Sequence, residues 1–240
     1  MTAVSRVEQT GPAAPWCYLC GSELGSRPSN WDHVPPKRFF PRSLRTGLRL
    51  HLLRLRTHVG CNNSYQLDEE YFCAALLPLS IASSSLTAQD AFEDLVRGAQ
   101  QPQGARLLMT VGYLPETIDV PDEGNATVLR NAILDAASHD EPCAVLRGLD
   151  QPRLHRVIWK IVRGLVICCM DYYLPECTSH TIEISMSLES PREKGSGWLS
   201  YHGDDEGVFC FRYAIAAKGR NLWELVIWSR IVASVSFVSS

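Results

Sequence analysis

The chain has 240 residues, of which 45% are hydrophobic and 20% are charged, and this ordinary globular composition excludes an intrinsically disordered protein. No uninterrupted apolar run reaches the roughly 18 residues of a membrane-spanning helix, and the first residues lack the apolar segment of a secretory signal. We therefore expect a cytoplasmic protein without a membrane partner. Its nine cysteines are then more consistent with buried thiols or metal ligands than with disulfides.

The net charge of −3 conceals an uneven distribution along the chain. Residues 1–67 contain nine basic and three acidic residues, a balance of +6, whereas 14 basic residues face 23 acidic ones in the remainder. No acid lies between Asp32 and Asp68. A basic segment in an acidic chain favours a local site for a polyanion, although a merely solvated basic face would have the same composition.

The predicted elements divide the chain into three parts. A flexible leader, residues 1–14, precedes a compact basic unit rich in Cys and His, residues 15–75, and an α+β part follows at residues 76–240. Apolar residues at helical spacing predict helices over 64–77, 85–100, 126–139 and 151–173. Residues 101–125 are predicted as a loop-rich connection that holds one strand, 105–114.

The helix predicted over 151–173 carries two stripes. Its apolar stripe comprises Leu154, Val157, Ile158, Ile161, Val162 and Leu165. Its cationic stripe comprises Arg153, Arg156, Lys160 and Arg163, and it would either extend a polyanion track or face solvent. After Pro175 the apolar period approaches two, which predicts strands within 180–188, 197–203, 207–217 and 222–238.

Two pairs of potential metal ligands flank the basic segment. Cys17 and Cys20 have the C-x2-C spacing with which two thiolates bind one zinc ion from a tight turn, and Gly21 is available to close that turn. His58 and Cys61 repeat the two-residue spacing. Together they would form a closed Cys3His site, which is typical of structural zinc. The alternative is a core histidine beside buried thiols.

Between these pairs lies the stretch WDHVPPK, with Asp32 and His33 followed by Pro35 and Pro36. The order of C-x2-C, Asp-His with prolines, a second ligand pair and then an Asn resembles the HNH, or ββα-metal, endonuclease family over residues 15–72. The second pair departs from the commoner Cys-x2-Cys, and no Asn lies between Asn30 and Asn62 to brace the loop. The resemblance implies an α+β fold in which a zinc-stabilised ββα-metal module precedes a helical and antiparallel-sheet part.

The resemblance also implies the chemistry of phosphodiester hydrolysis. His33 would take a proton from the attacking water, because an imidazole titrates near neutral pH. Asp32 and Asn62 would present oxygen ligands to Mg²⁺ or Mn²⁺, although Asn63 could take the place of Asn62. Successive side chains of a regular strand leave on opposite faces, so Asp32 and His33 would both reach the site only if the strand bends. HNH modules often belong to bacterial defence or mobile-element systems.

The basic segment would then hold the phosphates of nucleic acid, with DNA expected ahead of RNA, without reading its sequence. The candidate residues are Lys37, Arg38, Arg42, Arg45, Arg49, Arg54 and Arg56. Phe39 and Phe40 fit a local core better than base stacking. The alternative function is a non-catalytic zinc module that binds nucleic acid or a protein, and the part after residue 75 could mediate self-association or bind a protein partner.

Overall fold

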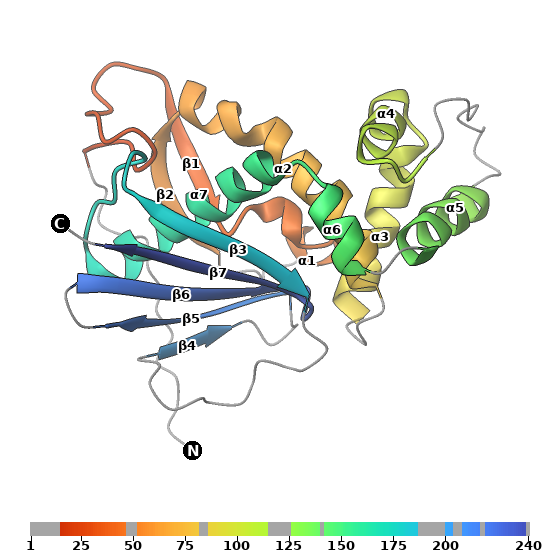
Figure 1. The fold of residues 1–240 in the computed structure, drawn as a ribbon. Coiled ribbons are helices and arrows are strands. Elements are labelled where there is room, and N and C mark those ends of the chain that lie inside the picture. Colours follow the sequence, from red (N-terminus) through yellow and green to blue (C-terminus); the bar gives the residue numbers. More distant parts are fainter. Residues whose placement is uncertain are drawn as a thin grey trace.

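The computed structural model describes residues 15–46, 52–81, 86–114, 126–139, 142–186, 200–203, 208–216 and 219–238. The leader predicted over residues 1–14, and Arg49, lie outside these ranges. The protein has a mixed α+β fold with two antiparallel sheets and a set of helices (Figure 1). Among the described residues, no helix has both the length and the apolar composition needed to cross a bilayer.

The first part of the chain forms a two-stranded sheet and a series of helices. Its elements are β1 (Ser29–Val34), η1 (Lys37–Phe39), α1 (Arg42–Thr46), β2 (Leu53–His58), α2 (Val59–Ser80), α3 (Leu86–Ala99), α4 (Pro102–Val111), α5 (Ala126–His139), α6 (Pro142–Gly148) and α7 (Gln151–Met170). Helices α3, α4 and α5 pack on α2, at the end away from the β1–β2 pair (Figure 1). Residues 75 and 76, where the sequence predicts a boundary, both lie inside α2.

The β1–β2 pair and α2 form a continuous ββα unit. The strands are antiparallel over their whole length, and α2 begins at Val59, directly after β2 ends at His58. Side chains alternate between the two faces of such a pair. Asp32 therefore shares one face with its cross-strand partner Leu55, and both are buried, whereas His33 shares the other face with Arg54. We call these the inner and the outer face of the hairpin.

Helix α7 packs against both α2 and the inner face of the hairpin (Figure 1). The apolar stripe predicted from its sequence is buried throughout, as expected. Its approach to β1 is close at Gly164, where an added Cβ would lie 2.6 Å from the Cγ2 of Val34. Only a residue without a side chain allows this distance, so Gly164 determines how near α7 lies to the Asp-His strand.

The last part of the chain is a five-stranded antiparallel sheet in the order β3-β7-β6-β5-β4. Its strands are β3 (His180–Met186), β4 (Ser200–Gly203), β5 (Phe209–Ile215), β6 (Arg220–Ile227) and β7 (Ile231–Val238). At the β6–β7 turn, the indole of Trp228 donates a hydrogen bond of 2.8 Å to the carbonyl oxygen of Phe39 and packs beside Phe72. Phe39 and Phe40 are fully buried, which confirms them as core. A single hydrophobic core thus joins the ββα unit to the sheet.

Two sequence predictions about the elements need correction. The strand predicted over 105–114 is helix α4, which starts with Pro102 and stops at Gly112, where φ is +88°. Its apolar run fits either period, and the proline and glycine mark helix ends. The stretch 222–238, predicted as strand throughout, is interrupted by a turn in which Trp228 and Ser229 both have positive φ. Neither residue type signals such a turn in a sequence.

Candidate metal centre and the Asp-His strand

The predicted Cys3His cluster is assembled in the structure. The ligand atoms of Cys17, Cys20, His58 and Cys61 all lie within 4.8 Å of one another. Two come from the turn before β1, one from the last residue of β2 and one from the first turn of α2. Three thiols and an imidazole at this spacing can hold a metal ion such as zinc, and an ion there would join both strands of the hairpin to the helix.

The turn that carries the first two thiols is closed by Gly21. Its N–H donates to the Cys17 carbonyl at 2.8 Å, and its φ of +73° lies in the left-handed region. An added Cβ would also lie 2.5 Å from the hydroxyl of Tyr173, which follows α7. Glycine is therefore required here both by conformation and by space, as the sequence predicts for conformation alone.

The ring of His58 is oriented for ligation. Its Nε2 lies 3.2 Å from the carbonyl oxygen of Glu23, and since a carbonyl only accepts, Nε2 carries the proton. The lone pair is then on Nδ1, which lies 3.4 Å from the Cys20 sulfur and 3.9 Å from the Cys61 sulfur. A backbone carbonyl that selects the tautomer in this way is a common feature around ligating histidines.

The electrostatics of the thiols also favour a cation. Burial of Cys17 opposes its ionisation, but hydrogen bonds from the Thr57 hydroxyl and from backbone N–H groups outweigh burial and lower its pKa to about 6. Burial and the neighbouring sulfurs of Cys17 and Cys20 raise the pKa of Cys61 to about 12. Ionisation of all three thiols would bring their negative charges into repulsion, and a divalent cation among them would offset this repulsion.

The Asp32 carboxylate lies on the inner face and is 6% exposed. Its Oδ2 accepts a hydrogen bond of 2.5 Å from the Tyr18 hydroxyl and lies 2.8 Å from the ammonium of Lys160 on α7. Its Oδ1 accepts the backbone N–H of His33 at 2.8 Å. Burial and the Asp32 charge raise the pKa of Tyr18 well above its ordinary value, so this phenol stays a donor. Both oxygens of Asp32 are therefore engaged within the protein.

Asp32 and Asn62 are the oxygen ligands that the family resemblance implies for Mg²⁺ or Mn²⁺, and each already has a partner within the protein. The side-chain amide of Asn62 donates to Asn30 at 3.4 Å, and Asn63 is exposed. The Lys160 ammonium lies 2.8 Å from the Oδ2 of Asp32. A divalent ion bound to Asp32 would therefore lie close to this ammonium and be repelled by its positive charge. The residues as arranged do not fit a Mg²⁺ or Mn²⁺ ion at this position.

His33 lies on the outer face and is partly buried. Burial lowers its pKa from the ordinary 6.5, the positive charges of Lys37 and Arg54 lower it further, and the Asp32 carboxylate opposes them. The imidazole is thus neutral at neutral pH. Neither ring nitrogen makes a hydrogen bond to any residue that the structure describes, which leaves both open to a water molecule. β1 does not bend to bring Asp32 and His33 to one face, because its pairing with β2 is regular throughout.

The basic residues of the segment divide into two groups. Lys37, Arg42 and Arg54 are exposed. Arg38 instead forms an ion pair of 2.9 Å with Glu70, and Arg45 donates to the backbone carbonyls of Phe40 and Arg38.

On the outer face, the guanidinium of Arg54 lies 5.7 Å from the centre of the Trp31 ring and that of Arg56 lies 5.3 Å from it. Trp31 is 37% exposed. The outer face therefore presents an accessible aromatic ring with two guanidinium groups near it, on the same face as His33.

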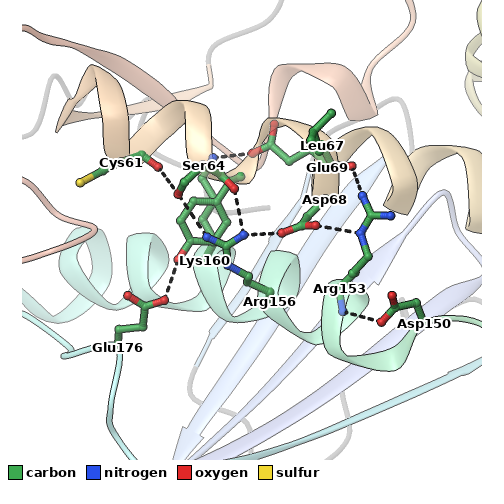
Figure 2. Close-up of polar contacts among 11 residues, drawn as sticks. Cys61, Ser64, Leu67, Asp68, Glu69, Asp150, Arg153, Arg156, Lys160 and Glu176 are labelled. Atoms are coloured by element: carbon green, nitrogen blue, oxygen red, sulfur yellow. Dashed lines mark hydrogen bonds and ion pairs between the residues drawn. The ribbon is translucent and has the colours of Figure 1, made fainter. Parts of the chain in front are cut away.

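The cationic stripe of α7 forms ion pairs and hydrogen bonds within the protein, with the Arg153 and Arg156 side chains 28% and 38% exposed. Arg153 and Arg156 bind the Asp68 carboxylate on α2, and the Lys160 ammonium contacts Glu69 (Figure 2). Arg163 is fully buried. These residues connect α7 to the ββα unit, and their regular spacing opposite the acids at 68–70 is the signal by which the sequence could have predicted this role.

Arg163 donates hydrogen bonds to the backbone of the turn that carries Cys17 and Cys20. Its Nη2 donates to the carbonyl oxygen of Leu19 and, at 3.3 Å, to that of Tyr18, both of which lie between Cys17 and Cys20. Its Nε donates to the carbonyl oxygen of Leu174 at 2.8 Å. A buried guanidinium thus satisfies backbone acceptors that would otherwise have no partner.

Comparison with protein-family models, with curated proteins and with solved structures finds no match to this chain. The geometry of the site therefore carries the functional argument alone. It consists of a cluster able to bind a metal ion, a hairpin and helix fastened by that cluster, and an outer face that presents a neutral imidazole among cations.

Proposed function

We propose that the protein is an endonuclease that hydrolyses phosphodiester bonds, with His33 as the general base and DNA as the first substrate to test. The observation that carries this proposal is the imidazole on the outer face, whose ring has no hydrogen-bond partner among the described residues and whose pKa is lowered by burial and by nearby cations. Cations at Arg54 and Lys37 lower its pKa, so both charges act on the ring. A neutral imidazole beside positive charge suits a base that acts on an anionic ester.

The proposed reaction uses groups of the outer face. A phosphate bound between Arg54 and Lys37 would lie beside the imidazole of His33, and a water held by a ring nitrogen would attack phosphorus. The water oxygen forms a bond to phosphorus, its proton passes to His33, and the bond from phosphorus to the leaving oxygen breaks. The leaving oxygen takes a proton from solvent. The two cations balance the charge that develops on the phosphoryl oxygens.

The other parts of the site would position these groups. Zinc bound by the Cys3His cluster would supply structural rigidity, since a closed four-ligand site has no position for substrate. Asp32 would act as a positioning residue through its hydrogen bond to the His33 backbone N–H. Trp31 would offer a stacking surface for a base, which adds affinity without sequence preference.

Substitution of His33 tests the proposal. We expect zinc-loaded His33→Ala to cleave plasmid or labelled duplex DNA about 10²–10⁴ times more slowly than the unmodified protein, with unchanged zinc content and melting temperature. His155→Ala is the matched control, because His155 on α7 is another imidazole whose pKa burial lowers. Its rate should be unaffected. Absence of cleavage by the unmodified protein, with no added cation and with Mg²⁺ or Mn²⁺, would contradict the proposal.

One observation favours the second candidate, a zinc module that binds nucleic acid without cutting it. The Asp32 carboxylate, the residue that the family resemblance assigns to a catalytic metal, is already bound to Lys160 and Tyr18. Fluorescence anisotropy with a labelled duplex separates the two functions. Binding that depends on Arg54, together with an intact duplex after prolonged incubation, would select the binding module.

A further inference from the structure

The inner face contains a buried group of charges that the proposed reaction does not use directly. Asp32 on β1 and Glu69 on α2 both contact the ammonium of Lys160 on α7, and the Lys160 side chain is 1% exposed. The Tyr18 hydroxyl donates to the same Asp32 oxygen. We propose that Lys160 is the resident cation of the Asp32–Glu69 pair and that the pair therefore binds no divalent cation in the native protein.

The ammonium of Lys160 offsets one of the two negative charges of this group. Two carboxylates meet one ammonium, and the guanidinium of Arg38 adds a further positive influence on Glu69. A divalent cation would bring a second and larger positive charge to carboxylates that are only 9% and 15% exposed at their side chains. It would also have to displace an ammonium whose side chain is 1% exposed and which contacts both acids.

Contacts of α7 one turn before and one turn after Lys160 fix the position of the helix at this residue. One turn further on, Gly164 allows the backbone of α7 to approach Val34, and Arg163 binds the turn between Cys17 and Cys20. One turn earlier, Arg156 binds Asp68 on α2 (Figure 2). Because α7 is attached to the strand, the metal-cluster turn and α2, the backbone that carries Lys160 is held beside the acids.

This inference deepens the proposed function, on which its consequence for cleavage rests. If the outer face cleaves phosphodiesters, it does so without added Mg²⁺ or Mn²⁺, because Asp32, the acid that the family resemblance assigns to that ion, holds a lysine instead. The binding of Mn²⁺ by the inner-face acids can be measured without any cleavage. A failure of the proposed function and a failure of this inference are thus separate results.

The test replaces the ammonium by an uncharged side chain of similar length. We expect zinc-loaded Lys160→Met to bind one Mn²⁺ per chain, seen by electron paramagnetic resonance and titration calorimetry, and its melting temperature to rise with Mn²⁺ concentration. The unmodified protein should show neither effect. Adding Asp32→Asn to Lys160→Met should weaken Mn²⁺ binding at least about tenfold. Arg106→Met, which removes an exposed cation on α4, is the matched control and should bind no Mn²⁺, like the unmodified protein.

Three results would overturn the inference. The first is a Mn²⁺ ion bound by the unmodified protein and lost in Asp32→Asn. The second is a folded Lys160→Met that binds no Mn²⁺, since the acids would then not form a cation site at all. The third is a Lys160→Met that stays unfolded at every Mn²⁺ concentration while the neutral triple variant Lys160→Met, Asp32→Asn, Glu69→Gln folds, since a second cation would then be unable to replace the ammonium.

Discussion

Two groups of cationic side chains in this protein have opposite roles. The outer group, Lys37 and Arg54, lies exposed around the imidazole of His33. The inner group, on α7, is directed at the ββα unit, where its members bind carboxylates and backbone carbonyls. Both groups consist of the same residue types, and both are conspicuous as basic runs in the sequence.

The acids explain the difference between the two groups. No acid lies between Asp32 and Asp68, so the outer group has few internal partners and stays available to an external anion. The inner group packs against α2, whose residues 68–70 are all acidic. A cluster of cations therefore indicates a polyanion site only where the fold supplies no acids to match it, and this condition depends on tertiary contacts.

The largest expected effect concerns the inner group. We expect Arg163→Met to lower the free energy of unfolding by about 3 kcal/mol or more, because buried carbonyls at Tyr18, Leu19 and Leu174 lose their donor. Zinc affinity should fall about tenfold or more, since two of these carbonyls lie between the cluster's thiols. Urea unfolding followed by tryptophan fluorescence and competition with a chelating dye measure the two quantities.

Arg106→Met is the control for this prediction, because Arg106 is exposed on α4 and far from the cluster in the fold. Its effect on unfolding should stay within about 0.5 kcal/mol. An Arg163→Met protein as stable as the control, with unchanged zinc affinity, would show that the inner group is dispensable. The inner and outer groups of cations would then differ in where they lie but not in their contribution to stability.

The metal cluster was predictable because its signal is local. Ligand spacing within Cys17–Cys20 and within His58–Cys61 is a property of single turns, and a tetrahedral ion needs only that two such turns meet. The long helices were predictable for the same reason, since the apolar stripe of α7 follows its own period. The role of a residue can be predicted from the sequence when that role depends on a single turn of the chain.

The partners of Asp32 were not predictable. Its ion pair with Lys160 joins β1 to a helix far along the chain, and the sequence shows both residues without showing that they meet. The assignment of Asp32 to a catalytic metal followed from the family resemblance and took no account of α7. Similarly, nothing local identifies Arg45 as a residue that binds backbone carbonyls rather than phosphate. Long-range packing decides the partner of each charge.

A smaller effect is expected from the outer group. Arg54→Gln should weaken binding to a labelled duplex and reduce the slope of log affinity against log salt by about 0.9, the value for loss of one phosphate contact. Arg156→Gln removes the same charge from the inner group, where the guanidinium binds Asp68, and should leave the slope unchanged. Anisotropy titrations at several salt concentrations compare them. Equal slopes for Arg54→Gln and the unmodified protein would remove Arg54 from the proposed phosphate site.

The smallest expected effect concerns the pKa of His33. It shows whether the charge of Lys37 lowers this pKa or only binds phosphate. Burial is the main cause of the lowered pKa of His33, and Lys37 lowers it further. Lys37→Gln should therefore raise this pKa toward 6.5. Since the base must be unprotonated, the fall in cleavage rate at acid pH should begin at a higher pH, while the rate at neutral pH changes little.

Nuclear magnetic resonance titration of the His33 ring measures the same shift without cleavage, with His155 as the internal control, because burial and His180 rather than Lys37 lower the pKa of His155. A His33 pKa that stays in place, or moves to lower pH, would mean that Lys37 does not act on the imidazole. Positive charge on the outer face would then bear on affinity for the anion and not on the protonation of the base.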